Sequence, residues 1–69
     1  MNGTNFNLSD REVEVLNLIV DGLTDEQISH ELKVTIHTAN AHRKHLLEKM
    51  VVNNVASLVR EAFRRGIVT

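Results

Sequence analysis

The feature that most constrains this chain is a series of helix-start signals within only 69 residues. Ser9 is followed three residues later by Glu12, and Thr24 by Gln27. Each pair has the form of a capping box, in which two side chains bond each other's backbone N–H groups. Thr35 is placed as a further N-cap. Signals this closely spaced leave room only for short helices.

Apolar residues at helical spacing and glycine breakers complete a prediction of four helices. Gly22 and Gly66 end the first and the last, because glycine readily takes the left-handed cap conformation. The predicted all-α fold has helices at approximately 9–22, 25–32, 36–50 and 54–65. Within the last helix, Leu58 and Phe63 are expected in the core, whereas Val55 is a candidate for a dimer contact. The other residues expected on apolar faces are Val13, Leu16, Ile19, Val20, Leu23, Ile28, Leu32, Ile36, Ala39, Leu46, Leu47, Met50, Val59 and Ala62.

Composition narrows the class of protein. The chain is 42% hydrophobic and 25% charged, which is typical of one globular domain. It has no cysteine, which excludes disulfides, thiolate metal sites and cysteine nucleophiles and fits a reducing cytoplasm. No apolar run is long enough to span a bilayer. We expect a tail at 1–7, a domain at 8–69, a cytoplasmic location and no membrane partner.

The charge is unevenly divided along the chain. Residues 1–32 carry one basic and seven acidic side chains, a net charge of −6. Residues 33–69 carry seven basic and two acidic ones, a net charge of +5. Attraction to phosphate depends on the local field more than on the total of −1. The second half is therefore expected to be a basic surface, for which a simple solvated face is the alternative.

The second and third helices are joined by the short turn Lys33-Val34-Thr35. Two helices so joined form the helix-turn-helix pattern, in which the first crosses the DNA backbone and the second lies in the major groove. The third helix also presents a polar stripe at helical spacing. This stripe consists of His37, Asn40, Ala41, Lys44 and Glu48.

Three stretches resemble the LuxR-type (GerE-like) DNA-binding domain of bacterial transcription and response regulators. They are Leu8-Ser9-x-Arg11-Glu12-x-Glu14-Val15-Leu16, Gly22-Leu23-Thr24-x-x-x-Ile28-Ser29-x-x-Leu32 and Thr35-x-x-Thr38-Ala39-x-x-His42-x-x-x-Leu46-x-x-Lys49-Met50. The resemblance runs from about Leu8 to Ile67. It implies four helices, of which the third reads DNA and the fourth commonly forms a homodimer contact.

The resemblance implies base-facing roles for Asn40, Ala41 and Lys44, and the helical stripe adds His37 to this set. Lys44 can donate to guanine O6 and N7, or neutralise a phosphate. Asn40 can pair with adenine N6 and N7, and Ala41 offers a methyl contact to thymine. The alternative for each is an ordinary solvent-facing side chain.

A second set is expected near phosphates. The resemblance implies this role for Thr24, Thr38, Arg43 and Lys49. His45 joins the set because its position on the third helix can bring it to the DNA backbone. Thr24 is alternatively only a helix cap. Protonation of a histidine beside phosphate would strengthen DNA binding at lower pH. Lys49 is also placed to pair with Glu12 across the domain.

The three histidines of the third helix do not form a metal site. The spacing of His37, His42 and His45 does not bring them to one side of the helix, and no cysteine joins them. His42 lies toward the inner face, where a structural hydrogen bond is expected. No metal and no cofactor are therefore expected.

Five positions depart from the LuxR-type pattern. Asn40 stands where Lys or Arg is frequent, and Ala39 stands where Val is usual. Val51 replaces a frequent Gly, and Ser29 replaces the usual Ala. Glu48 adds a negative charge to the helix surface. These departures bear on affinity and target sequence more than on fold.

The sequence thus predicts an effector domain that binds double-stranded DNA sequence-specifically, with two copies on related half-sites. Without a Gly-rich phosphate loop or paired carboxylates in a cleft, it is not expected to be an enzyme. One alternative is a promoter-reading region like that of sigma factors, which usually ends soon after the recognition helix. Another is a helical protein-interaction module with a basic face. RNA polymerase is a further candidate partner.

Overall fold

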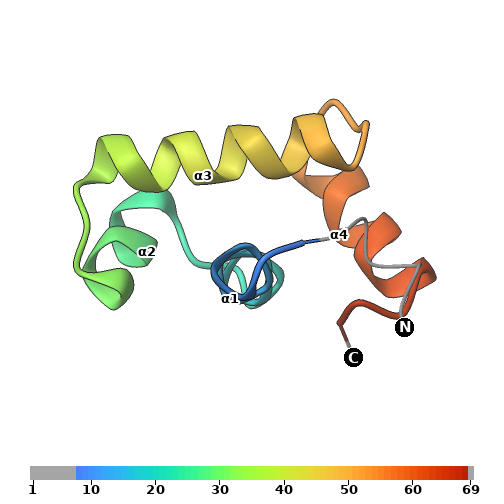
Figure 1. Cartoon of the computed structure of the whole chain (residues 1–69), viewed down its shortest axis with the longest axis horizontal. Helices are drawn as coiled ribbons and strands as arrows, with labels where there is room; N and C mark the ends of the chain where they lie inside the picture. The colour runs from blue at the N-terminus through green and yellow to red at the C-terminus, as the bar shows by residue number, and fades with distance from the viewer. Residues whose placement is uncertain (1–7, 69) are drawn as a thin grey trace.

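The computed structural model describes residues 8–68. Its helices are α1 (Asp10–Val20), α2 (Asp25–Leu32), α3 (Ile36–Lys49) and α4 (Val55–Arg64). In Figure 1, α3 runs along one edge, and α1, α2 and α4 lie beneath it. The predicted all-α helix-turn-helix fold is confirmed, and the helices are shorter than expected only where the expected ranges took in capping residues.

Side-chain caps begin every helix of the described region. Ser9 Oγ accepts from the backbone N–H of Glu12 at 3.1 Å, and Glu12 Oε1 accepts from that of Ser9 at 2.8 Å. Thr24 and Gln27 form the same reciprocal pair at 3.2 and 2.8 Å. Both predicted capping boxes are therefore present. The N-caps are Ser9, Thr24, Thr35 and Asn54.

The four helices also end alike. A residue with positive φ follows each helix, and the next backbone N–H bonds a carbonyl five residues back, which is the Schellman arrangement. Gly22 and Gly66 occupy the left-handed position after α1 and α4, as expected. Lys33 and Val51 occupy it after α2 and α3 at φ +58° and +57°. A β-branched residue such as Val51 is strained in this conformation.

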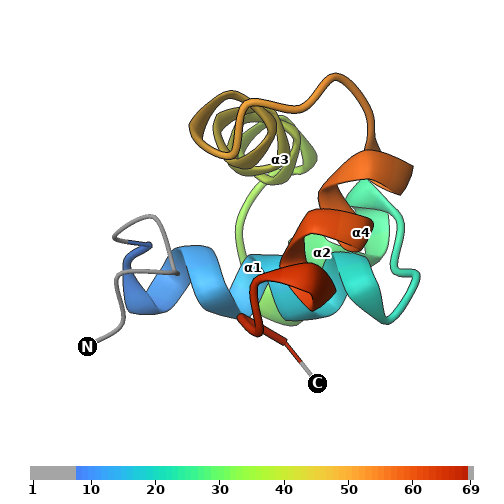
Figure 2. The same ribbon diagram turned by 90° about the vertical axis from the view of Figure 1, so that its right-hand side faces the viewer.

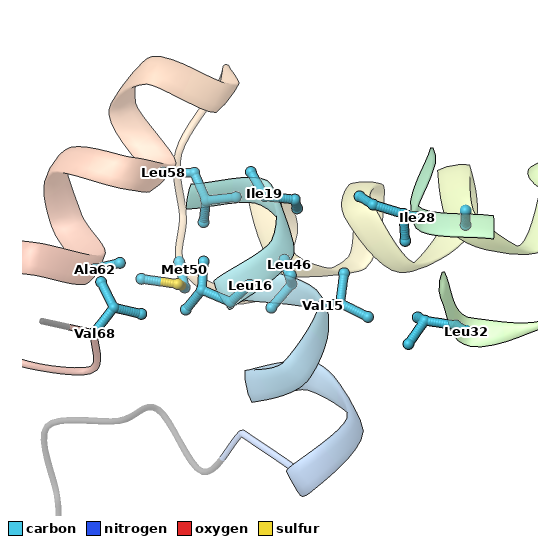
Figure 3. Close-up of a cluster of buried hydrophobic side chains, with 11 residues drawn as sticks. Val15, Leu16, Ile19, Ile28, Leu32, Leu46, Met50, Leu58, Ala62 and Val68 are labelled. Atoms are coloured by element: carbon cyan, nitrogen blue, oxygen red, sulfur yellow. The ribbon is translucent and has the colours of Figure 1, made fainter. Parts of the chain in front are cut away.

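One apolar core joins all four helices (Figure 3). Leu16 and Leu46 lie at its centre, between the side chains of α4 and those of α2, and neither is exposed to solvent. Val15 is also fully buried although the sequence did not predict it. Because α1 packs against α2, α3 and α4 at once, its buried stripe is wider than one line of residues. Val20 and Leu23, expected on the apolar face of the first helix, lie half-buried at the border of this core.

Two residues expected on the apolar faces are substantially exposed. Ile36 is 54% exposed, and Phe63, predicted to be in the core, is 49% exposed. At 100° per residue, Phe63 points about 140° away from the buried Leu58, toward solvent. Ile36 opens α3 and points about 60° away from the buried Ala39. Among residues 8–68, no helix is long and apolar enough to cross a membrane.

Candidate nucleic-acid interface

The outer side of α3 is uncovered. Figures 1 and 2 both show α3 along one edge of the molecule, with every other described helix on its inner side. The inner side carries the buried Ala39 and Leu46, and Met50, the C-cap that follows the helix, is buried as well. We call the opposite, solvent-facing line of side chains the outer strip of α3. Its four residues, all exposed, are His37, Ala41, Lys44 and Glu48.

Lys44 is the cation of this outer strip. Its side chain is exposed, and no ion pair or hydrogen bond to it is found within residues 8–68. An unpaired ammonium group on a convex helix can donate to base edges or to phosphates without first breaking an internal bond. Glu48, one turn further along, places a carboxylate at the other end of the strip. The strip is therefore cationic in its middle and anionic toward its C-terminal end.

Asn40 lies on the flank of α3 that faces α2. Its Nδ2 donates to Asp25 Oδ2 at 2.9 Å, and Arg43 Nη2 donates to the same oxygen at 3.1 Å. Arg43 Nε lies 3.0 Å from Asp25 Oδ1 in an ion pair, although off the line of a hydrogen bond. The sequence assigned Asn40 to bases and Arg43 to phosphates. In the structure, both are held by one carboxylate that sequence reasoning did not single out.

The other flank of α3 faces the start of α1. Lys49 Nζ lies 3.0 Å from Glu12 Oε1, which confirms the pair expected from the sequence. The bond from the backbone N–H of Ser9, and then the bond from Lys49, hold the pKa of Glu12 below its ordinary value. Thr38 is half-buried and accepts from the hydroxyl of Thr35 at 3.0 Å. The cation of Lys49 is therefore partly neutralised.

Thr24 is exposed at the start of α2, and its hydroxyl oxygen already accepts from Gln27. The hydroxyl proton remains available for a phosphate. Asp25 and Glu26, however, stand in the same first turn, and their charges oppose an approaching anion. His45 is exposed, as a phosphate-facing role requires. His42 is half-buried as expected, but its ring has no hydrogen bond within residues 8–68, so the predicted structural hydrogen bond is wrong.

The basic surface expected from the second half of the chain is only partly basic. Asp25 and Glu12 come from the acidic half, and they pair with Arg43 and Lys49. On α4, hydrogen bonds first from Arg64 and then from Arg65 hold the pKa of Glu61 below its ordinary value. Linear charge counting misses this because residues 12 and 49, far apart in the chain, become neighbours only after folding. Arg43 and Lys49 are thus engaged in ion pairs, whereas no ion pair of Lys44 is found within residues 8–68.

Comparison with known proteins places the chain among regulators. A sequence model of bacterial regulatory proteins of the luxR family matches residues 6–62. The transcriptional regulatory protein MctR of Rhizobium johnstonii is 40% identical over 62 residues, which are 90% of this chain and 29% of that protein. The response regulatory protein YgeK of Escherichia coli is 36% identical over 90% of this chain and 42% of its own length. The chain thus spans well under half of these relatives.

A solved structure shows the same fold. The crystal structure of the response regulator ChrA, from a heme-sensing two-component system, aligns with a TM-score of 0.83 and 28% identity. The alignment covers 88% of this chain and 30% of ChrA. The oxygen regulatory protein NreC of Staphylococcus carnosus is 33% identical over 88% of this chain and 28% of its own length.

Proposed function

Because the chain belongs to the luxR family of bacterial regulatory proteins, we propose that it reads duplex DNA by laying α3 in the major groove. The observation that carries this proposal is the uncovered outer strip of α3, with Lys44 unpaired among the described residues. The groove admits one α-helix, and α3 is the longest helix described. The domain would be formed by residues 8–69.

In this proposal, His37, Ala41 and Lys44 face the bases from the outer strip, and Asn40 reaches them from the flank beside α2. Phosphate contacts on either side fix the register of the helix in the groove. The residues proposed to face phosphates are Thr24, Thr38, Arg43, His45 and Lys49. Arg43 can serve without leaving Asp25, because its Nη1 group is not used in that pair.

We further propose that two copies pair through α4 when they occupy adjacent half-sites. Phe63 supports this contact, because its large apolar ring is 49% exposed on that helix. Sedimentation of the domain on a duplex carrying two half-sites should show two copies, and Phe63→Asp should reduce this to one. Unchanged stoichiometry in the Phe63→Asp protein would reject the contact.

Backbone amide shifts measured by NMR test the DNA contact directly. Labelled protein is titrated with a short duplex of mixed sequence at low salt. We expect shifts that cluster at residues 35–45 and around Thr24, and that fade as salt is raised. An unperturbed α3 in a protein that keeps its fold would reject the proposed function.

Lys44→Ala tests the unpaired cation of the outer strip, with Arg11→Ala on α1, outside both α3 and the proposed dimer helix, as a control of equal charge change. Duplex affinity is measured by fluorescence anisotropy across a salt series. If Lys44 faces a base, its loss costs about 1–3 kcal/mol and relaxes sequence preference; if it faces a phosphate, the salt slope falls by about 1. Equal effects of the two variants would show that Lys44 contributes only to net charge.

A further inference from the structure

The contact between Asp25 and Asn40 crosses from α2 to α3 at the edge of the proposed interface. Asp25 is the first residue of α2, and its side chain is 23% exposed. It accepts from Asn40 at 2.9 Å and from Arg43 at 3.1 Å, both at Oδ2. Asn40 and Arg43 are three residues apart, so both project from the same side of α3. One carboxylate therefore holds two of the residues proposed to meet DNA.

The chemistry of this contact fixes the orientation of the Asn40 amide. An ionised carboxylate can only accept hydrogen bonds, so the amide nitrogen must face Asp25 and the amide oxygen must face away. Only one of the two N–H groups of Nδ2 is used by Asp25. The other N–H and Oδ1 remain available. Asp25 thus selects one of the two amide orientations that an unrestrained asparagine could adopt.

We propose that Asp25 is a positioning residue that sets the base preference of Asn40. This inference rests on the proposed function, in which Asn40 reaches the bases. An asparagine recognises adenine by accepting from N6 and donating to N7 in a fixed order. A base with a different pattern requires the amide to flip or rotate, which breaks its bond to Asp25. Competing bases are therefore penalised through a residue that touches no DNA.

The arrangement also explains how an acidic residue is tolerated here. Arg43 places Nε at 3.0 Å and Nη2 at 3.1 Å from the oxygens of the Asp25 carboxylate. The guanidinium charge therefore offsets the negative charge of Asp25 beside the phosphates. Even so, Asp25 should weaken general attraction to DNA, because a residual negative field persists around a partly exposed pair. Asp25 should therefore lower the affinity for DNA of any sequence and raise the selectivity at the Asn40 base pair. A purely structural role for Asp25 would change affinity and selectivity in the same direction.

The test compares Asp25→Asn with Glu26→Gln, a neighbouring substitution with the same charge change at an exposed carboxylate. A preferred duplex is first selected from a random pool with the unmodified protein. For Asp25→Asn, we expect tighter binding to mixed-sequence DNA together with about a three- to tenfold loss of discrimination at the Asn40 base pair. For Glu26→Gln, we expect the gain in affinity without the loss of discrimination. Equal discrimination in the two variants would overturn the proposal.

A second arm asks whether Asp25 acts through Asn40. In an Asn40→Ala background, Asp25→Asn should cause no further loss of discrimination, because the amide that it positions is gone. An undiminished loss in that background would assign the effect to another residue and overturn the proposal. Circular dichroism of each variant confirms that the helices are retained.

A third arm uses the free protein, so that failure of the inference is distinguishable from failure of the proposed function. The side-chain amide of Asn40 should exchange with solvent more slowly in the unmodified protein than in Asp25→Asn, and Glu26→Gln should match the unmodified protein. Equal exchange in all three proteins would overturn the positioning role even if DNA binds. Slow exchange without any salt-dependent duplex binding would reject the proposed function, and the inference about base preference with it.

Discussion

At the scale of a single residue, Val51 occupies the left-handed position of a Schellman ending, where its β-branched side chain is strained. It holds φ +57° after α3, and its side chain is 85% exposed. Packing therefore offers little to offset the strain of a β-branched residue in the left-handed region. The sequence marks the same position, since LuxR-type domains frequently have Gly there.

We predict that Val51→Gly stabilises the domain by about 1 kcal/mol, because relief of backbone strain outweighs the added entropy of the unfolded chain. Urea denaturation followed by circular dichroism measures the change. Val51→Ala is the matched control: alanine keeps a Cβ and most of the strain, so its effect should be small. A glycine variant no more stable than the alanine variant would argue against strain at this residue.

Glu12 links the stability of the domain to pH. Its pKa is lowered in the folded state by the bonds from Ser9 and Lys49, so folding favours its charged form. This stabilisation is present above the ordinary glutamate pKa of about 4.3 and is lost as the pH falls through the lower folded-state pKa. Gln can keep the bond to the backbone of Ser9, as Gln27 does for Thr24.

We therefore predict that Glu12→Gln costs about 0.5 kcal/mol at neutral pH, a small value because the pair with Lys49 is partly exposed. The cost should shrink as the pH falls below about 4. Thermal denaturation across this pH range measures it, with Glu31→Gln as the control, because Glu31 is exposed on α2 and no ion pair of its carboxylate is found within residues 8–68. A pH-independent difference would mean that the charge of Glu12 contributes nothing.

At the scale of the element, α3 combines two different sides on one helix. Its inner side is fixed by the buried Ala39 and Leu46 and by the buried C-cap Met50, whereas the four residues of the outer strip are all exposed. Changes on the outer strip should therefore alter binding without altering the fold. Glu48 is the acidic residue of this strip and should repel DNA phosphate.

We predict that Glu48→Lys strengthens binding to a mixed-sequence duplex and steepens the salt dependence by up to about 0.9 in slope. Fluorescence anisotropy over a salt series measures both quantities. Glu14→Lys makes the same charge reversal on α1, away from the outer strip, and should produce a smaller change. If the two variants strengthen binding equally, the strip has no special place in the interface.

At the scale of the whole molecule, stability depends on the few side chains that all four helices share. Leu58 is fully buried and connects α4 to the rest, whereas Phe63 on the same helix is half exposed. Losing the smaller side chain should therefore cost more than losing the larger one. A domain of this size has little stability in reserve.

We predict that Leu58→Ala destabilises the domain by about 2–5 kcal/mol, because a cavity remains in the core. Phe63→Ala should cost about 1 kcal/mol, in proportion to its partial burial. Urea denaturation at low protein concentration compares the two without a contribution from dimers. A larger cost for Phe63 would mean that its ring is buried in solution.

The sequence by itself determined where the helices begin and end and which stripe of α3 is polar. These properties depend on residues within a few positions of one another: Ser9 with Glu12, Thr24 with Gln27, and Lys44 one turn from Ala41. Backbone hydrogen bonding and helical spacing settle them locally. The ion pair of Glu12 and Lys49 is the one correct prediction that does not follow this rule, because it joins residues far apart in the chain.

Only the tertiary structure decided which side chains the core covers and which charges neutralise each other. Val15 is buried because three helices pack around α1, and Phe63 is half exposed because α4 packs on one side only. Asp25 captures Asn40 and Arg43, which lie 15 and 18 residues away along the chain. Burial and ion pairing act through space, so no local pattern determines them before the helices have packed.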